Sequence, residues 1–352
     1  MKVSSVVRLA LLSLFLSPLL SVLARALPPE DDYHLIMKYT LGGEGGWDYM
    51  TLDPSTRRLY ISHRDHVHVL DADSRAVIGD ISGMHLVHSI ALVKELGRGF
   101  ISDGSGHTAF GNGGDRIVIF DLVTLKIIGE VKTSKNPDCL IYDPTSRRIF
   151  SFSGVARNVS VIDPANGTLI ATIPLGGQVE YAVADGKGMI YNNVEDTNEI
   201  IALDSLSLTI KARWPVAPTG KPTALAMDRE HHRLFSAGRN PKKLVVIDAD
   251  SGSVIQSFPI GGNADAVVYE PETGLVFAST GEGRLDIFHE DSPEGFRLIQ
   301  TIYTQPGART MALDPKTHNL FLVTADFGAP PNPADPRPRI LPGTFGLLVY
   351  GR

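Results

Sequence analysis

Short apolar strands alternate with polar turns from residue 33 to the end of the chain, and the same order of elements recurs seven times. Each unit has a glycine-bounded polar step, an apolar strand, an Asp-Pro type of turn, a second strand and a β-branched strand that closes on aspartate. The clearest copy reads GGWDYMTLDPSTRRLYISH from Gly45, followed by VHVLD ending at Asp71. β-branched runs bounded by turn residues predict strands, and no unit shows the i, i+3, i+4, i+7 apolar spacing of a helix. The pattern therefore predicts an all-β protein.

The period of the repeat narrows the choice among all-β folds. Successive closing aspartates, at positions 71, 121, 163, 204 and 248, are 50, 42, 41 and 44 residues apart. A period of this size with about four short strands per unit is typical of β-propeller blades. The seventh unit stops after its third strand at Tyr350, whereas an extra strand, Tyr33 to Leu41, precedes the first unit. We expect a seven-bladed β-propeller in which this N-terminal strand completes the last blade.

The first 26 residues have the pattern of a secretory signal peptide. Lys2 and Arg8 precede an apolar run from Leu9 to about Leu23, and Ala24-Arg25-Ala26 is a small-x-small cleavage signature. The run is short for a membrane span, which disfavours the alternative of an uncleaved anchor. We expect residues 27–352 to form a single propeller domain in the periplasm or outside the cell, without a transmembrane segment after cleavage. The single Cys139 excludes an intrachain disulfide and is expected to be a small buried residue.

The chain resembles the YncE-like, YVTN-repeat family of exported bacterial β-propellers. The resemblance covers residues 33–351 and rests on the closing strands VHVLD, IVIFD, VSVID, IIALD and LVVID, with Asp-Pro-type turns at Asp53, Asp143 and Asp228. The literal Tyr-Val-Thr-Asn string is absent. The resemblance implies an exported propeller with WD40-like repeats. It does not imply one function, because propellers include binding proteins, lactonases, lyases and dehydrogenases.

Nucleic-acid binding, which has been associated with this resemblance, fits the residues poorly. Single-stranded DNA calls for a basic groove with stacking aromatic side chains. The net charge is -6 and the sequence pI is about 6.0. The basic residues of blades five to seven are diluted by Asp265 and Glu282, and few aromatic residues fall in the loops. We therefore do not expect a nucleic-acid partner.

One repeat position, five residues before the turn aspartate or its equivalent, carries polar residues of several types. Because the innermost strand of each blade begins at the same face, these side chains should form a ring around the channel mouth. A purely structural position would tend to repeat one residue type, which favours ligand binding; the alternative is that these residues hydrogen-bond the amides of neighbouring strands. The seven are Asp48, His88, Asp138, Glu180, Thr223, Asp265 and Arg309.

Polar residues in the loops that return to the same face add to the candidates. His63 is one of them, and we group it with the ring as a ligand-binding residue. Two of these loops are long, Gly104 to Asp115 and the proline-rich Gly328 to Gly343, and both are expected to lie over the channel face. Surface excursion is an equally good interpretation of the second.

A divalent metal is the sharpest chemical hypothesis for this face. Histidine and carboxylate donors suit Zn, Mn or Ca, and Asp48, His88 and Glu180 are the candidate ligands. Ligands from separate blades leave no characteristic spacing, so the pattern gives this set little support. A c-type haem is excluded because it needs two cysteines in C-x-x-C-H, and no G-x-S-x-G nucleophile elbow occurs between a strand and a helix.

Three classes of function remain open from the sequence. The first is a non-catalytic exported propeller that binds a small ligand, an ion or an envelope protein at the channel mouth. The second is a metal-assisted hydrolase or lactonase that uses the same face. The third is a structural surface protein that binds through its outer strands. We expect a monomer in each case.

Overall fold

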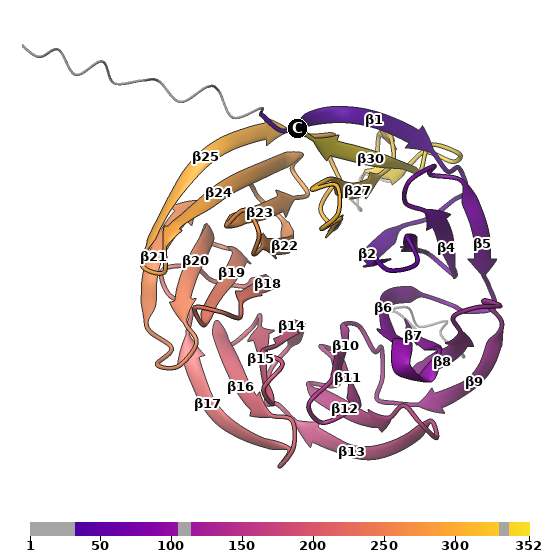
Figure 1. The fold of residues 1–352 in the computed structure, drawn as a ribbon, viewed down its shortest axis with the longest axis horizontal. Coiled ribbons are helices and arrows are strands. Elements are labelled where there is room, and N and C mark those ends of the chain that lie inside the picture. Colours follow the sequence, from indigo (N-terminus) through magenta and orange to yellow (C-terminus); the bar gives the residue numbers. More distant parts are fainter. Residues whose placement is uncertain (1–31, 105–113, 331–337) are drawn as a thin grey trace, which may run out of the picture. The chain divides into compact units, whose positions relative to one another are not determined.

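The computed structural model describes residues 32–104, 114–330 and 338–352, of which Tyr33–Arg352 form one compact unit. In this unit, seven four-stranded antiparallel sheets are arranged as blades around a central channel (Figure 1). The prediction of an all-β, seven-bladed propeller is confirmed. The predicted leader, residues 1–26, lies outside the described residues.

Each of the first six blades is a meander whose strands run outward from the channel in chain order. Blade one contains β2 (Trp47–Asp53), β3 (Arg58–His63), β4 (His66–Asp71) and β5 (Val77–Ile81). Blade two contains β6 (Val87–Val93), β7 (Arg98–Asp103), β8 (Arg116–Asp121) and β9 (Ile127–Lys132), with the short 3-10 helix η1 (Lys94–Leu96) after β6. Blade three contains β10 (Leu140–Asp143), β11 (Arg148–Ser153), β12 (Asn158–Asp163) and β13 (Thr168–Pro174).

The next three blades repeat this arrangement. Blade four contains β14 (Val179–Ala184), β15 (Met189–Val194), β16 (Glu199–Asp204) and β17 (Thr209–Pro215). Blade five contains β18 (Pro222–Asp228), β19 (Arg233–Arg239), β20 (Lys242–Asp248) and β21 (Val254–Pro259). Blade six contains β22 (Ala264–Glu270), β23 (Leu275–Thr280), β24 (Arg284–Ser292) and β25 (Gly295–Tyr303).

Blade seven joins the two ends of the compact unit. Its strands are β26 (Met311–Leu313), β27 (Leu320–Thr324), β30 (Gly346–Gly351) and, outermost, β1 (His34–Thr40). The antiparallel register of β1 and β30 pairs His34 with Gly351 and Thr40 with Gly346. The predicted closure by the N-terminal strand is confirmed, and the edge that β30 would otherwise expose is covered.

The recurrent aspartates have a local structural role. In blade one, the Asp53 carboxylate accepts hydrogen bonds from the Ser55 amide at 3.0 Å and from the Thr56 hydroxyl at 2.8 Å. The closing Asp71 accepts a bond from the Ser74 amide at 2.7 Å. An aspartate that binds amides two or three residues ahead stabilises a tight turn. This repeated chemistry explains why the period is visible in the sequence.

The hydrophobic core consists of seven clusters, each between two neighbouring blades. The cluster between blades seven and one contains Trp47, Phe321 and Phe345, so the first and last blades pack like any other pair. Cys139 is fully buried in the cluster between blades three and four, as expected, and burial raises the pKa of its thiol. No helix among the described residues is long and apolar enough to cross a membrane.

The base of the proline-rich loop is described. β28 (Phe327–Gly328) pairs with β29 (Arg339–Ile340), and Phe327 packs against Trp47 with ring centroids 6.1 Å apart. The Gly343 amide donates to the Gly43 carbonyl at 2.8 Å, which joins this loop to the loop before β2. Residues 331–337, and residues 105–113 of the other long loop, lie outside the described part of the chain, so the predicted cover over the channel face remains a prediction.

Candidate functional site at the channel mouth

The predicted ring position coincides with an irregularity in the innermost strands. In five blades the register between the first and second strands shifts where the ring residue lies: Asp48, His88, Glu180, Thr223 and Asp265. A β-bulge leaves a residue outside the regular ladder and redirects its side chain. In blades three and seven, Asp138 and Arg309 lie two residues before the regular strands β10 and β26.

Three of the ring residues meet across three adjacent blades. His88 Nδ1 lies 2.7 Å from Asp48 Oδ2 and 3.8 Å from Asp138 Oδ1. One potential ligand atom from each residue lies within 4.8 Å of the other two. The structure therefore groups Asp48 and His88 with Asp138, where the sequence interpretation had placed Glu180 with them.

The charge state of this group follows from its surroundings. Burial opposes protonation of His88, but Asp138 and the hydrogen bond to Asp48 outweigh it and raise the pKa of His88 to about 9. Burial raises the pKa of Asp138 to about 6, against the attraction of His88. At pH 7 the imidazole is therefore a cation held between carboxylates. A metal ion at this position would have to displace that proton.

A second group of charged side chains comes from blades five, six and seven. Asp265 is 7% exposed and receives hydrogen bonds from Arg239 Nη2 and Arg309 Nε, each at 2.5 Å. Arg309 also donates to the Trp47 carbonyl at 2.9 Å. Burial opposes the charge on both arginines, but Asp265 raises the pKa of each. Arg239 comes from the end of β19 and was not among the ring candidates.

Among the described residues, Glu180 forms no ion pair, although the charge of Arg239 partly offsets the increase in its pKa. Its nearest recorded side-chain contact is with Gln178 Nε2, at 3.4 Å. Burial raises the pKa of Glu180 well above its usual value, and the charges of Asp138 and Asp265 raise it further. Asp138 Oδ1 is also buried without a hydrogen-bond partner in the described part of the chain. Asp138 and Glu180 are thus the ring carboxyls whose ionisation is opposed by burial and by neighbouring acids.

Thr223 hydrogen-bonds a neighbouring strand. This is the structural role that we considered for all seven ring residues as the alternative to ligand binding. Its hydroxyl donates to the Ala264 carbonyl of the next blade at 2.6 Å. Two hydroxyls outside the ring position donate across blades in the same way, Ser102 to the Asp138 carbonyl at 2.7 Å and Thr310 to the Asp48 carbonyl at 2.8 Å. Within blade one, the Ser62 hydroxyl accepts a bond from the Asp48 amide at 2.9 Å. The charged ring side chains are consequently free to pair with each other.

Two tyrosines that sequence reasoning missed close the channel beside the ring. Tyr49 and Tyr181 directly follow Asp48 and Glu180, and their rings lie 5.0 Å apart, from blades one and four. Burial, followed by the charges of Asp138, Asp48, Asp265 and Glu180, raises the pKa of Tyr49 well above its usual value. Tyr49 thus lies close to all four ring acids. The signal available in the sequence was an acid-tyrosine pair at the same repeat position.

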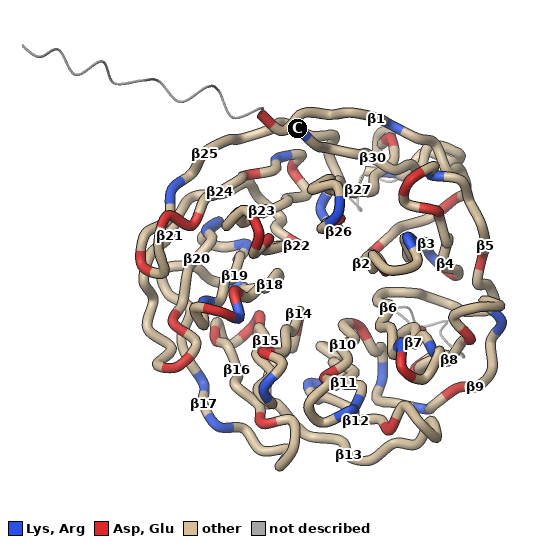
Figure 2. Tube along the Cα trace, in the orientation of Figure 1, with Lys and Arg blue, Asp and Glu red and all other residues tan. Residues whose placement is uncertain are grey.

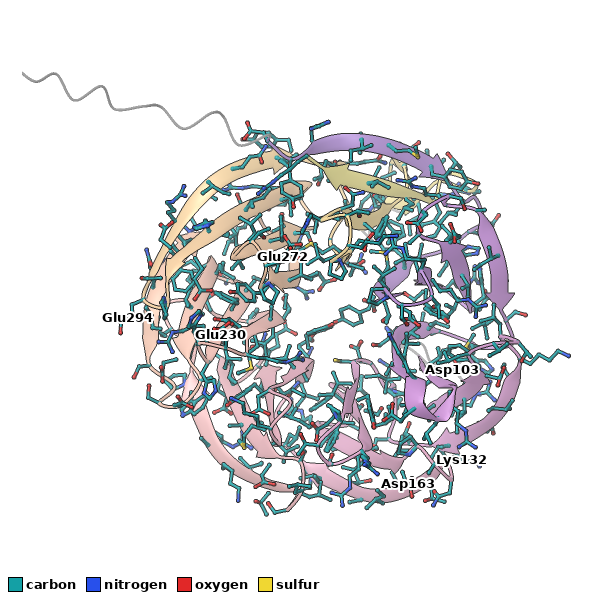
Figure 3. The ribbon with its side chains drawn as sticks, in the orientation of Figure 1. Asp103, Lys132, Asp163, Glu230, Glu272 and Glu294 are labelled. Atoms are coloured by element: carbon teal, nitrogen blue, oxygen red, sulfur yellow. The ribbon has the colours of Figure 1, made fainter. Side chains whose placement is uncertain are left out.

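A cavity of about 630 Å³ occupies the channel along the innermost strands. Tyr181 lines it, together with Met50, Leu225 and Met311. Asp228, Arg229 and Glu230, at the end of β18 and directly after it, also line this cavity, and Figure 3 labels Glu230 inside the outer strands, whereas Glu294 lies on the outer rim. Tyr181 belongs both to the tyrosine pair and to the cavity lining.

His63 is not joined to the ring. It lies at the end of β3, where it pairs in register with Trp47 on one side and His66 on the other. Its contacts are with His66, His68 and Phe345. Burial and the neighbouring His66 and His68 lower the pKa of His63 to about 4. The remaining return-loop residues include Asp103, which is fully buried and accepts bonds from the His85 amide and Arg116.

Acidic and basic residues are interspersed around the propeller, without a basic sector (Figure 2). At the mouth, the arginines nearest the channel are paired with Asp265. A phosphate backbone needs clustered, unpaired Lys and Arg. The expectation that nucleic acid is not a partner stays a prediction.

The raised pKa values of His88 and Asp138 lead to a prediction for how the stability of the protein depends on pH. The folded-state pKa values of His88 (about 9) and Asp138 (about 6) both exceed the usual values of 6.5 and 3.8. A group with a raised folded pKa stabilises the fold below its unfolded pKa and loses this contribution as pH rises through the folded value. We therefore expect the melting temperature to fall between about pH 6.5 and 9 because of His88. The replacement His88→Asn should remove this part of the decline in calorimetric scans; an unchanged profile would contradict the assignment.

Comparison with known proteins identifies the fold class. No family model and no curated protein matches the sequence, so the YncE-like resemblance remains a prediction. Among solved structures, the chain is similar to one in the crystal structure of the mitotic checkpoint complex, with a TM-score of 0.72, 14% identity, and coverage of 97% of this chain and 99% of that one. It is also similar to U3-55K, with a TM-score of 0.71, 11% identity, and coverage of 91% and 99%. At such identities the likeness establishes a propeller fold of the WD40-like kind and nothing about ligands.

Proposed function

We propose that this propeller is an exported, non-catalytic binding protein whose channel mouth holds a small ligand with a positively charged ammonium or guanidinium group. The observation that carries the proposal is the pair of buried carboxyls, Asp138 and Glu180: burial and neighbouring acids raise the pKa of each, and Asp138 Oδ1 makes no hydrogen bond with the described residues. Crowded acids of this kind are stabilised by a cation placed among them.

The surroundings support binding over hydrolysis. His88 is protonated at neutral pH and held by Asp48 at 2.7 Å, so it is poorly suited to hold a metal there. The buried Tyr49, which packs on Tyr181, lowers the local dielectric constant beside the ring, and a low dielectric constant strengthens an ion pair with a bound cation. Asp265 is already neutralised by Arg239 and Arg309, and this leaves Asp138 and Glu180 as the receptor groups.

Three probes of equal chain length test the proposal: putrescine, 1,4-butanediol and succinate. Calorimetric titration is expected to show saturable binding of putrescine and none of the neutral or anionic analogue. Because the pKa of Asp138 is raised to about 6 and a bound cation would lower it, binding near pH 6 should release protons, and the heat should depend on the ionisation enthalpy of the buffer. The apparent affinity should rise with pH.

Two matched substitutions locate the binding. Glu180→Gln and Asp138→Asn should each weaken putrescine binding by about tenfold or more, since a charge-assisted hydrogen bond is worth about 1.5–3 kcal/mol. Glu294→Gln removes the same charge on the outer rim (Figure 3) and should have no effect. Preferential binding of succinate would instead indicate Arg239 and Arg309 as receptors and would refute the proposal, as would the absence of binding by ammonium and guanidinium compounds generally.

The export component rests on residues 1–26 alone. Their charged start, apolar run and Ala24-Arg25-Ala26 support removal of the segment during secretion. The mass of the protein recovered from the periplasm or the medium tests this part separately: a mature chain starting near Leu27 is expected, and a full-length cytoplasmic chain would contradict it.

A further inference from the structure

Three histidines on one hairpin bring their ring nitrogens together, apart from the channel-mouth ring. His63 ends β3 and His66 begins β4, and the two are directly paired across the two-residue turn Arg64-Asp65. His68 lies two residues after His66. Since side chains alternate along a strand and directly opposed residues share a face, the sequence H-x-x-H-x-H places all three imidazoles on one face of this hairpin.

The distances between the nitrogens are those of ligands around one ion. His68 Nε2 lies 3.1 Å from His66 Nε2 and 3.2 Å from His63 Nδ1, and all three nitrogens lie within 4.8 Å of one another. Two nitrogens that are each about 2.0–2.1 Å from a tetrahedral zinc ion are about 3.3 Å apart. The hairpin thus spaces three imidazole nitrogens as a zinc ion requires.

Carboxylates behind two of the rings orient these nitrogens. Asp65 Oδ1 lies 2.9 Å from His66 Nδ1, and Asp80 Oδ2 lies 3.1 Å from His68 Nδ1. An Nδ1–H bond to a carboxylate leaves the Nε2 lone pair available, and metal-binding histidines commonly have such a partner. The two Nε2 atoms therefore face each other with lone pairs, an arrangement that a cation between them would stabilise.

The third ring is held by packing. The His63 side chain is fully buried and stacks on Phe345 with ring centroids 4.0 Å apart and an interplanar angle of 17°. Gly43 has a φ of +86°, and a Cβ at this glycine would lie 2.7 Å from His63 Cε1, so the loop before β2 packs directly on the ring. His63 Nε2 is buried and makes no hydrogen bond with the described residues. The site is thus built on two strands and a covering loop.

We propose that His63, His66 and His68 form a binding site for a zinc ion, separate from the channel mouth. The side chains of His66 and His68 are 20% and 14% exposed, so the ion can enter from solvent. Three protein ligands leave the fourth zinc position for water or for an oxygen or nitrogen atom of a bound molecule. Imidazole ligands favour zinc and its transition-metal neighbours over magnesium or calcium.

Titration of untagged, EDTA-treated and dialysed protein with zinc sulfate, followed by calorimetry, tests the site. One zinc per chain is expected, and cobalt(II) in its place should give the visible absorption bands of a tetrahedral site. His68→Ala should weaken zinc binding by about 100-fold or more, and Asp80→Asn, which removes only the carboxylate behind His68, by about 10- to 100-fold. His66→Ala provides a second ligand deletion at a more exposed position.

Two histidine controls distinguish this site from others. His232→Ala removes a histidine that pairs with Asp250 elsewhere on the surface and should leave zinc binding unchanged. His88→Ala removes the histidine of the channel-mouth group and should also leave it unchanged. The proposal is overturned if the wild-type protein binds no zinc, if His66→Ala and His68→Ala bind as tightly as wild type, or if His88→Ala abolishes binding.

Discussion

Replacing Asp265 by alanine is expected to lower the free energy of unfolding by about 2–4 kcal/mol, the largest loss for any single charge at the channel mouth. Asp265 is the common partner of Arg239 and Arg309, at 2.5 Å from each, so its removal leaves two partly buried guanidinium groups without a counter-charge. The arginine side chains are about one-third exposed, and water can compensate part of the loss. Urea unfolding monitored by tryptophan fluorescence measures the change.

A surface ion pair provides the control for this prediction. Glu130 pairs with Arg116 and has a half-exposed side chain, so Glu130→Ala should cost about 0–1 kcal/mol. Equal effects of the two substitutions would show that the Asp265 group is as weakly coupled as an ordinary surface pair. The bonds of Asp265 to Arg239 and Arg309 would then contribute little to the stability of the channel mouth.

The second large effect is expected where the ring closes. Phe321 is 1% exposed in the cluster between blades seven and one, and Phe321→Ala should destabilise the protein by about 3–5 kcal/mol while unfolding remains a single transition. Phe277 is the control, because it is fully buried between blades six and seven, which follow each other in the chain. Phe277→Ala should cost the same to within about 1 kcal/mol, since closure makes the two interfaces equivalent.

Calorimetric scans of both variants test whether the two interfaces are equivalent in stability. If Phe321→Ala costs less than about 1 kcal/mol, or unfolds in two steps while Phe277→Ala unfolds in one, the first and last blades open before the rest of the ring. A third substitution, Val123→Ala at a 77% exposed position, should change the stability by no more than about 0.5 kcal/mol.

The fold was predictable from the sequence because its determinants are local and repeated. Asp53 and Asp71 stabilise turns through hydrogen bonds to residues two or three positions ahead, and their equivalents recur at a nearly constant period. The ring position was predictable for a related reason, since one repeat position has one place in the blade. Five of the seven ring residues lie at a β-bulge that occurs at the equivalent place in each of five blades.

The partners of those residues were not predictable, because they depend on contacts between blades. Asp138 rather than Glu180 joins Asp48 and His88, and Arg239 reaches Asp265 from a different strand position. No sequence interval encodes such contacts. The histidine cluster is a different case, because the spacing of His63, His66 and His68 was visible in the sequence. His63 and His66 were interpreted as residues of a polar return loop and His68 as part of the closing strand, and the pairing that brings the imidazoles together depends on the β3-β4 register.

The bulges at the start of the innermost strands separate recognition from folding. Bonds between blades at this level are made by Ser102, Thr223 and Thr310, whereas most of the charged ring side chains pair with other charged side chains. Residues at these positions can therefore be exchanged as complementary sets without altering a strand ladder or an interblade core. In evolution, one scaffold can acquire a new ligand preference through substitutions at a few positions about one blade apart in the sequence. For an engineer, the six charged ring positions form a small library whose members should share a single backbone.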